Sequence, residues 1–338
     1  MASKRTYIRY FTKDKLEKIN PKSVKVYEKY RRARISKDKN VAETTYKTYQ
    51  NYFNQFLVFL MEEYDNMYIL SEDFQDESVE ILEDFIVFCQ DKLGNNKKVI
   101  NTKLSAVSSF FLWAVKRGMI DVHPFDRKLE RMRGAKDEKL IGNHFLNDEQ
   151  INKITEKVEA ECEKQGGMFD IQDVLIWRIA LDSGCRLGAL TRLNLESLHL
   201  ESMSFVDIRE KRGKITDIPY VKKTGQYIEK WLKQREEREI ECEGLFIVKY
   251  DGEWKPMSGT SIYKRVKKMG SIIGLDDFRP HCIRKTAVNR IVEKTGNLTL
   301  AQDFAGHESP ETTAGHYVKQ KSKAEIRDQL SKIINTED

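Results

Sequence analysis

Proline, glycine and cysteine are all sparse in this chain of 338 residues, which has 6 Pro, 18 Gly and 5 Cys. Few breakers, together with a charged fraction of 33%, predict a largely helical protein. The cysteines lie singly, without the close pairs of zinc sites or the dense, even set of a secreted disulfide scaffold, so we expect reduced thiols. No apolar run approaches the roughly 20 residues of a membrane helix. We therefore expect a soluble, cytoplasmic protein without a membrane partner.

The positive charge is concentrated at the N-terminus. The net charge is +6, yet residues 1–40 alone hold fourteen Lys and Arg against four Asp and Glu. Arg31 and Arg32 lie there among several tyrosines. Two interpretations stay open: a partly helical leader in solvent, or an arm on a phosphate backbone, where each cation displaces a condensed counterion.

Three amphipathic helices are predicted between residues 41 and 130, from apolar residues at spacings of three and four. The inward positions are Tyr49, Phe53, Phe56, Leu57 and Leu60, then Val79, Leu82, Phe85, Ile86 and Cys89, then Leu104, Val107, Phe110, Phe111 and Ala114. In the third helix Lys97, Lys98 and Lys103 are expected on the outer face. A basic helix face is often only solvent-exposed, so by itself it is a weak signal for DNA.

A charged segment, residues 131–144, loses the apolar period and is predicted to be a linker. A helix is expected after it, capped by Asn147 or Asp148. Farther on, the runs FVDIRE and ITDIPY flank KRGK and predict a β-hairpin. Lys211 and Lys214 lie at its tip.

The stretch from His281 to Tyr317 gathers side chains suited to phosphate chemistry. His281 and Arg284 are three residues apart, so they share one face of a helix. His307 follows a glycine at a predicted turn, and Tyr317 comes ten residues later. Cationic groups neutralise phosphodiester oxygens, and a phenol beside them is placed to attack. No cluster of Asp and Glu resembles a two-metal nuclease site, so we expect no metal ion and no other cofactor.

These motifs resemble those of the tyrosine recombinases, the phage-integrase type of site-specific DNA recombinase. The similar stretches are HCIRK, AGH and GHY in that order, with SGCRLGAL upstream and the KRGK hairpin between. The resemblance covers roughly residues 41–320. Any one short motif is weak, whereas five in the same order and spacing are specific.

The resemblance implies a mainly α, multidomain fold that closes on duplex DNA as a C-shaped clamp. A helical core-binding, SAM-like domain would occupy residues 41–130, and a mixed α/β catalytic domain with a small sheet would occupy residues 145–320. Residues 1–40 would form an arm or an extra DNA-contacting segment. Residues 321–338 would form a tail helix that docks on a neighbouring subunit.

It also implies roles for particular residues. The catalytic residues carried over are Arg186, Lys211, His281, Arg284, His307 and the nucleophile Tyr317. The arginines would bind the non-bridging oxygens, Lys211 would protonate the leaving 5′ oxygen, and the histidines would assist. Lys214 stays open as the alternative catalytic lysine. The implied DNA contacts are Arg31, Arg32, Lys97, Lys98, Lys103 and Lys214.

The implied partners are duplex DNA, three further copies of the chain on paired DNA sites, and an accessory excision or bending protein. The basic N-terminus favours integration or excision of a mobile element. Two other functions stay open: a type IB topoisomerase, and a DNA-binding regulator that has lost strand transfer.

Three positions depart from the family pattern. The tyrosine usually stands nine positions after the second histidine, and His316 stands at that place here, one before Tyr317. Ala189 replaces an acidic residue often found three after the first arginine, and Lys285 stands where a histidine is common.

Overall fold

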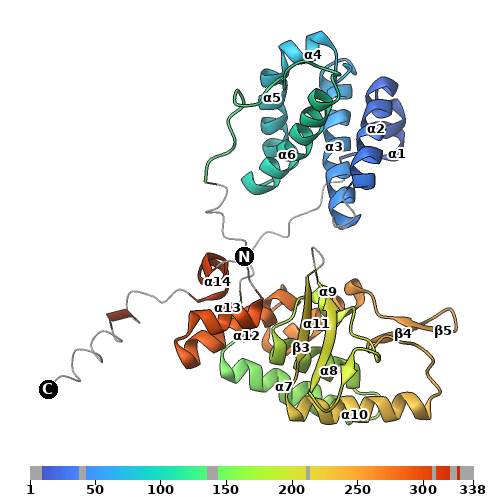
Figure 1. Cartoon of the computed structure of the whole chain (residues 1–338), viewed down its shortest axis with the longest axis vertical. Helices are drawn as coiled ribbons and strands as arrows, with labels where there is room; N and C mark the ends of the chain where they lie inside the picture. Colours follow the sequence, from blue (N-terminus) through green and yellow to red (C-terminus); the bar gives the residue numbers. More distant parts are fainter. Residues whose placement is uncertain are drawn as a thin grey trace. The chain divides into compact units, whose positions relative to one another are not determined.

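The computed structural model describes residues 10–37, 43–134, 144–210, 214–306, 310–319 and 326–327. It divides into two compact units, Met1–Leu140 and Ile141–Asp338 (Figure 1). No helix within the described ranges is long and apolar enough to cross a membrane.

The first unit is all helical. Its elements are α1 (Lys13–Lys18), α2 (Pro21–Lys37), α3 (Glu43–Glu63), α4 (Glu72–Asp76), α5 (Ser78–Asp91) and α6 (Lys97–Lys116). The three predicted helices are confirmed as α3, α5 and α6. Their apolar faces meet in an aromatic core, where the ring centroids of Phe53 and Phe110 lie 5.0 Å apart and those of Phe56 and Phe85 lie 5.1 Å apart. These four rings are fully buried.

Helix α2 is part of this core rather than a separate arm. The ring of Tyr27 stacks on Phe53 with centroids 3.9 Å apart, and Tyr30 meets Phe110 edge-on at 5.6 Å. Both tyrosines are buried, because their spacing of three places them on one helical face. Residues 10–37 therefore pack within the first unit, which begins well before residue 41. Contact of this segment with DNA stays a prediction.

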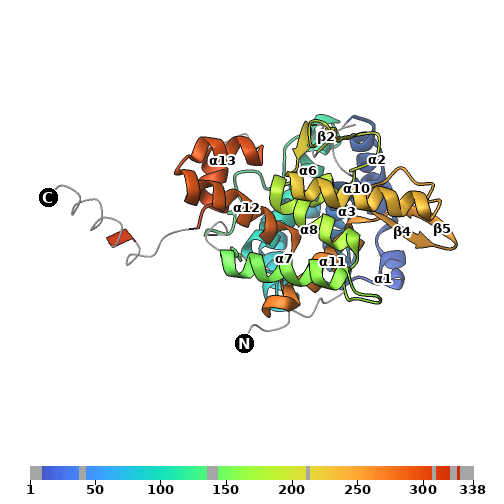
Figure 2. The same cartoon turned by 90° about the horizontal axis from the view of Figure 1, so that it is seen from below.

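The second unit is built around one central helix. Its elements are α7 (Asp148–Cys162), α8 (Ile171–Ser183), α9 (Leu187–Leu190), β1 (Leu198–His199), β2 (Ser204–Arg209), β3 (Ile215–Pro219), α10 (Lys222–Glu237), β4 (Ile247–Tyr250), β5 (Glu253–Pro256), α11 (Gly259–Gly270), η2 (Ser271–Ile273), α12 (Pro280–Thr295), α13 (Leu298–Ala305) and α14 (Pro310–Tyr317). Helix α8 is buried on all sides and contacts α7, α10, α11, α12 and β3 (Figures 1 and 2). Asn147 caps α7 in a capping box with Gln150, as predicted for that helix start.

Two small antiparallel sheets flank the helices. The predicted hairpin is confirmed as β2 and β3, with Arg209 opposite Ile215, and β1 adds a third strand. The pair β4 and β5 was not predicted, although its Asp251-Gly252 turn is a hairpin signal. Both turn residues have positive φ, 52° and 80°.

Candidate active site

Arg284 is held between the C-terminal ends of two helices. It lies in α12, is only 3% exposed, and donates from Nη1 to the carbonyl of Gly184 at 2.6 Å and from Nη2 to the carbonyl of Ala305 at 2.5 Å. These carbonyls end α8 and α13, where no intrahelical donor reaches them and the helix dipole is negative. A guanidinium satisfies both, so the ends of the two helices fix its position.

Tyr317 packs directly against this arginine. The Arg284 guanidinium lies 5.4 Å from the centroid of the tyrosine ring. The ring of His281 meets the Tyr317 ring edge-on, with centroids 5.3 Å apart. Beyond the tyrosine, the backbone N–H of Lys319 donates to Oδ1 of Asn289 at 2.8 Å.

Three of the sequence-predicted catalytic residues are thus brought together, with Arg284 and His281 both in contact with the Tyr317 ring. Tyr317 is the last residue of α14 and is 8% exposed. The additional residue before it therefore does not keep the tyrosine from His281 and Arg284.

Arg186 reaches the site from the short connection between α8 and α9. Its side chain is 38% exposed, and Nη1 forms an ion pair with Oε2 of Glu210, whose side chain is 6% exposed. Ala189 is buried in α9 and offers no carboxylate, so the acidic partner of Arg186 comes from the end of β2 instead. Sequence reasoning missed Glu210, because the spacing of 24 residues between the two carries no signal of contact.

The local charge is strongly positive. Partial burial, followed by the positive charges of Lys285, Arg284 and Arg186, lowers the pKa of His281 to about 4. Its imidazole is therefore neutral at pH 7 although part of the side chain faces solvent. Lys285 is itself buried, with Nζ 5.5 Å from the ring centroid of Phe145, and burial lowers its pKa. Such an arrangement suits an anionic ligand.

Of the two hairpin lysines, the structure describes only Lys214. Lys211 lies outside the described residues, as does His307. Lys214 is exposed, and its Nζ donates to the carbonyl of Gly306 at 3.0 Å, which joins the hairpin to the end of α13. This predicted DNA contact is therefore engaged within its own chain, and the choice between Lys211 and Lys214 as catalytic lysine stays open.

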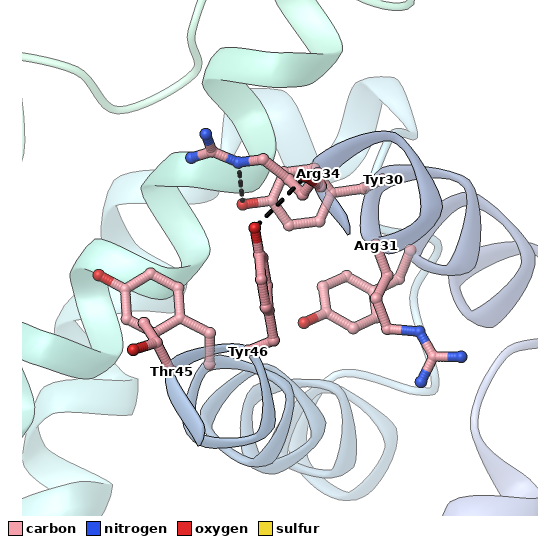
Figure 3. Close-up of a pocket in the computed structure, with 7 residues that line it drawn as sticks. Tyr30, Arg31, Arg34, Thr45 and Tyr46 are labelled. Carbon is pink, nitrogen blue, oxygen red and sulfur yellow. Dashed lines mark hydrogen bonds between the residues drawn. The ribbon is translucent and has the colours of Figure 1, made fainter. Parts of the chain in front are cut away.

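The predicted DNA contacts of the first unit differ in exposure. Arg32, Lys97 and Lys98 are exposed, whereas Arg31 is half-buried. Arg31 lines a pocket with the α2 residues Tyr30 and Arg34 and the α3 residues Thr45 and Tyr46 (Figure 3). Residues that line this pocket are hydrogen-bonded to one another. The Tyr30 hydroxyl accepts from Arg34 Nε at 3.4 Å, and the Tyr46 hydroxyl donates to the Arg34 carbonyl at 3.3 Å.

Lys103 does not lie on the outer face, and that prediction is wrong. The residue is 2% exposed, and its ammonium group contacts Oδ1 of Asn95 and lies 3.5 Å from Sγ of Cys89. These partners compensate a buried cation, which leaves it unavailable to a phosphate. Within the described ranges, no group of three His, Cys, Asp or Glu side chains is placed to hold a metal ion.

Family comparisons cover both units. Residues 144–324 match the model of the phage integrase family, and residues 32–131 match that of the phage integrase SAM-like domain. The tyrosine recombinase XerC of Proteus mirabilis is 26% identical over 212 residues, which are 62% of this chain and 64% of that protein. XerC of Mannheimia succiniciproducens is 27% identical over 230 residues, 68% of this chain and 73% of that protein.

Solved structures share the fold. The Tn1549 transposon integrase in complex with transposon right end DNA aligns with a TM-score of 0.65 at 17% identity, over 92% of this chain and 98% of that one. A lambda integrase dimer bound to a core site aligns at 0.62 with 14% identity, over 89% and 96%. Since one family model spans more than half of the chain and contains the arginine, histidine and tyrosine cluster, the chain belongs to the phage integrase family of tyrosine recombinases.

Proposed function

We propose that this chain is a site-specific DNA recombinase that cleaves and rejoins duplex DNA through a covalent bond to Tyr317. The observation that carries the proposal is the placement of this phenol against the Arg284 guanidinium and the His281 ring. A tyrosine with a cation and a neutral base in contact has what a nucleophile for a phosphodiester requires.

The reaction follows from these groups. The Tyr317 oxygen attacks the phosphorus, the bond from phosphorus to the 5′ oxygen breaks, and a 3′-phosphotyrosine forms. His281, neutral because of its low pKa, accepts the phenolic proton directly or through water. Arg186 and Arg284 bind the non-bridging oxygens, where negative charge develops. Lys211 protonates the leaving 5′ oxygen, and His307 assists, as the family resemblance implies.

Attack by a 5′-hydroxyl of another duplex reverses these steps and joins the exchanged strands. The phosphotyrosine conserves the energy of the broken bond, so the reaction consumes no ATP, and protein cations take the place of metal ions. We further propose four subunits on paired sites, one strand pair exchanged at a time, an accessory bending or excision protein, and a mobile element as the substrate. The basic N-terminal segment and the fold shared with a transposon integrase support this assignment.

In this proposal the two units have different functions. The helical unit, through the exposed Arg32, Lys97 and Lys98, contacts the DNA backbone, and the second unit cleaves it. They are joined by residues 131–144 and together close around the duplex as a clamp. Residues 321–338 dock on a neighbouring subunit, and all of these except Ile326 and Arg327 lie outside the described residues.

The test is covalent capture of DNA. The protein is incubated with nicked suicide duplexes tiled across the DNA that flanks its gene, and adducts that survive detergent are counted. We expect an adduct at discrete sites, none from Tyr317→Phe, and a normal yield from Tyr250→Phe, which removes the hydroxyl of a tyrosine that is 70% exposed.

Other outcomes point elsewhere. An adduct formed by Tyr317→Phe at the wild-type rate overturns the assignment of the nucleophile. Relaxation of any supercoiled plasmid, without site preference, identifies a topoisomerase. Binding to DNA without any adduct identifies a regulator.

A further inference from the structure

Glu210 is a buried carboxylate that the chemistry described above leaves without a role. Its side chain is 6% exposed, and its partner is Nη1 of Arg186. Exposed ion pairs contribute little, whereas a buried carboxylate without a partner is costly. This contact is therefore a fixed part of the catalytic unit.

The position of Glu210 ties the β2–β3 hairpin to the first arginine. It follows β2 directly and precedes Lys211, and its backbone N–H donates to the carbonyl of Lys214 at 2.6 Å. In the sequence, the residue directly after this carboxylate is the predicted general acid, Lys211. Through the ion pair the end of β2 is attached to the connection between α8 and α9.

The carboxylate also moderates repulsion between the two arginines. Burial has the largest effect on Arg284 and lowers its pKa, and the charge of Arg186 lowers it further. The negative charge of Glu210 acts in the opposite direction. Glu210 therefore offsets part of the positive charge that Arg186 and Arg284 bring to the site.

The geometry leaves part of Arg186 for a ligand. A guanidinium is a rigid plane with five N–H donors. Nη1 is directed to Glu210, which restricts rotation of the plane, while 38% of the side chain is still exposed. The remaining donors are thereby held in one orientation on the open side.

We propose that Glu210 is a positioning residue for strand cleavage: its carboxylate orients the Arg186 guanidinium so that the exposed donors face the scissile phosphate. This role rests on the proposed function, since the phosphate is the substrate named there. Glu210 itself makes and breaks no bond in the reaction. It acts only through Arg186.

The first test compares rates of adduct formation in Glu210→Gln and Glu159→Gln. The control removes a carboxylate of the same unit that pairs with Arg178 and Lys223 instead of Arg186. Because misplacement of a catalytic group by about 1 Å costs up to about 100-fold, we expect Glu210→Gln to slow cleavage by about 10- to 100-fold. DNA affinity and melting temperature should fall no more than in Glu159→Gln. Cleavage by Glu210→Gln at the rate of Glu159→Gln overturns the proposal.

A double mutant separates positioning from general structural support. If Glu210 acts through Arg186, Glu210→Gln should slow the residual cleavage of Arg186→Lys by less than about threefold, because the interaction is already absent. If the double mutant instead loses the product of the two single-mutant rate reductions, Glu210 does not act through Arg186, and the proposal fails.

A third measurement needs no reaction. In the DNA-free protein, NMR should report slow rotation of the Arg186 guanidinium about its Nε–Cζ bond, and faster rotation in Glu210→Gln. Equal rates in the two proteins overturn the proposed orientation. A wild-type protein that forms no adduct on any duplex counts instead against the proposed function, and the rotation rates still show whether Glu210 orients the Arg186 guanidinium.

Discussion

Gly184 is the residue at which the chain leaves α8 and presents a carbonyl to Arg284. Its φ is 59°, a left-handed conformation that costs other residues about 1 kcal/mol or more. A Cβ built there would lie 2.6 Å from Cε1 of Phe304, which is closer than real carbon atoms approach. The position is therefore restricted both by backbone conformation and by space.

This gives a prediction with a matched control. Gly184→Ala should reduce the free energy of unfolding by more than Gly296→Ala, which also ends a helix with positive φ, 66°, but meets nothing within 4 Å. The control should lose about 1 kcal/mol, and Gly184→Ala should lose that plus the cost of moving Phe304. Urea unfolding measures both, and equal losses would show that the ring moves aside freely.

His281 should titrate far below an ordinary histidine. Its pKa of about 4 lies under the value near 6.5 of an unfolded chain. Between these two pH values the unfolded state binds more protons, so stability should decline as pH drops from about 6.5 toward 4. NMR titration of the imidazole measures the pKa directly, and His281→Asn should lose this part of the pH dependence. A midpoint near 6.5 in the folded protein would contradict the prediction.

At the scale of the element, α6 shows where sequence reasoning succeeds and fails. Its apolar stripe is predicted correctly, and Lys103 in fact falls on that stripe, between Ile100 and Leu104. The positive charge of Lys103 predicts a surface position, whereas its place in the apolar period predicts a core position. Periodicity prevails here because Asn95 and Cys89 supply polar partners for the ammonium group, and the sequence pattern does not reveal such partners.

Salt dependence of DNA binding tests this assignment of the helix faces. Removal of one Lys–phosphate interaction should reduce the slope of log affinity against log salt by about one. Lys98→Ala should show that reduction if α6 meets DNA, whereas the slope of Lys103→Met should equal the wild-type slope. A reduced slope for Lys103→Met in a normally folded protein would restore this lysine as a DNA-binding residue.

The contacts between elements were the least predictable part of the site. Motif spacing identified Arg284 and Tyr317, because they belong to one continuous stretch of helices. The pairing of Arg186 with Glu210 depends on how the hairpin folds back on α8 and α9, and no local pattern encodes that. The hairpin of β4 and β5 differs in this respect, since its Asp251-Gly252 turn is a local pattern that does indicate a hairpin.

At the scale of the whole molecule, each unit has a core of its own. The first is packed with aromatic rings from α2, α3, α5 and α6, and the second surrounds α8. The basic composition of residues 1–40 indicates a surface segment, whereas Tyr27 and Tyr30 bury one face of α2 in the first core. Composition therefore identified a basic segment correctly but not its place in the fold.

Separate cores predict separate folding. Fragments 1–140 and 141–338 should each melt cooperatively, with helical circular dichroism spectra that sum to that of the intact chain. Removing residues 1–40 from the first fragment should abolish its transition, because Tyr27 and Tyr30, which pack on Phe53 and Phe110, are removed with them. A shortened fragment that melts at the same temperature would show that α2 contributes nothing to the stability of the unit.

The acceptors that hold Arg284 have a consequence for how such a chain tolerates change. Both belong to the backbone, at Gly184 and Ala305, and a carbonyl oxygen is present whatever side chain the residue carries. Substitutions around the arginine can therefore accumulate over generations without removing its supports, provided that α8 and α13 still end at the same points. What inheritance must preserve at this site is the point at which each helix ends and, at Gly184, the residue type as well, because its positive φ and the Phe304 ring disfavour a side chain there.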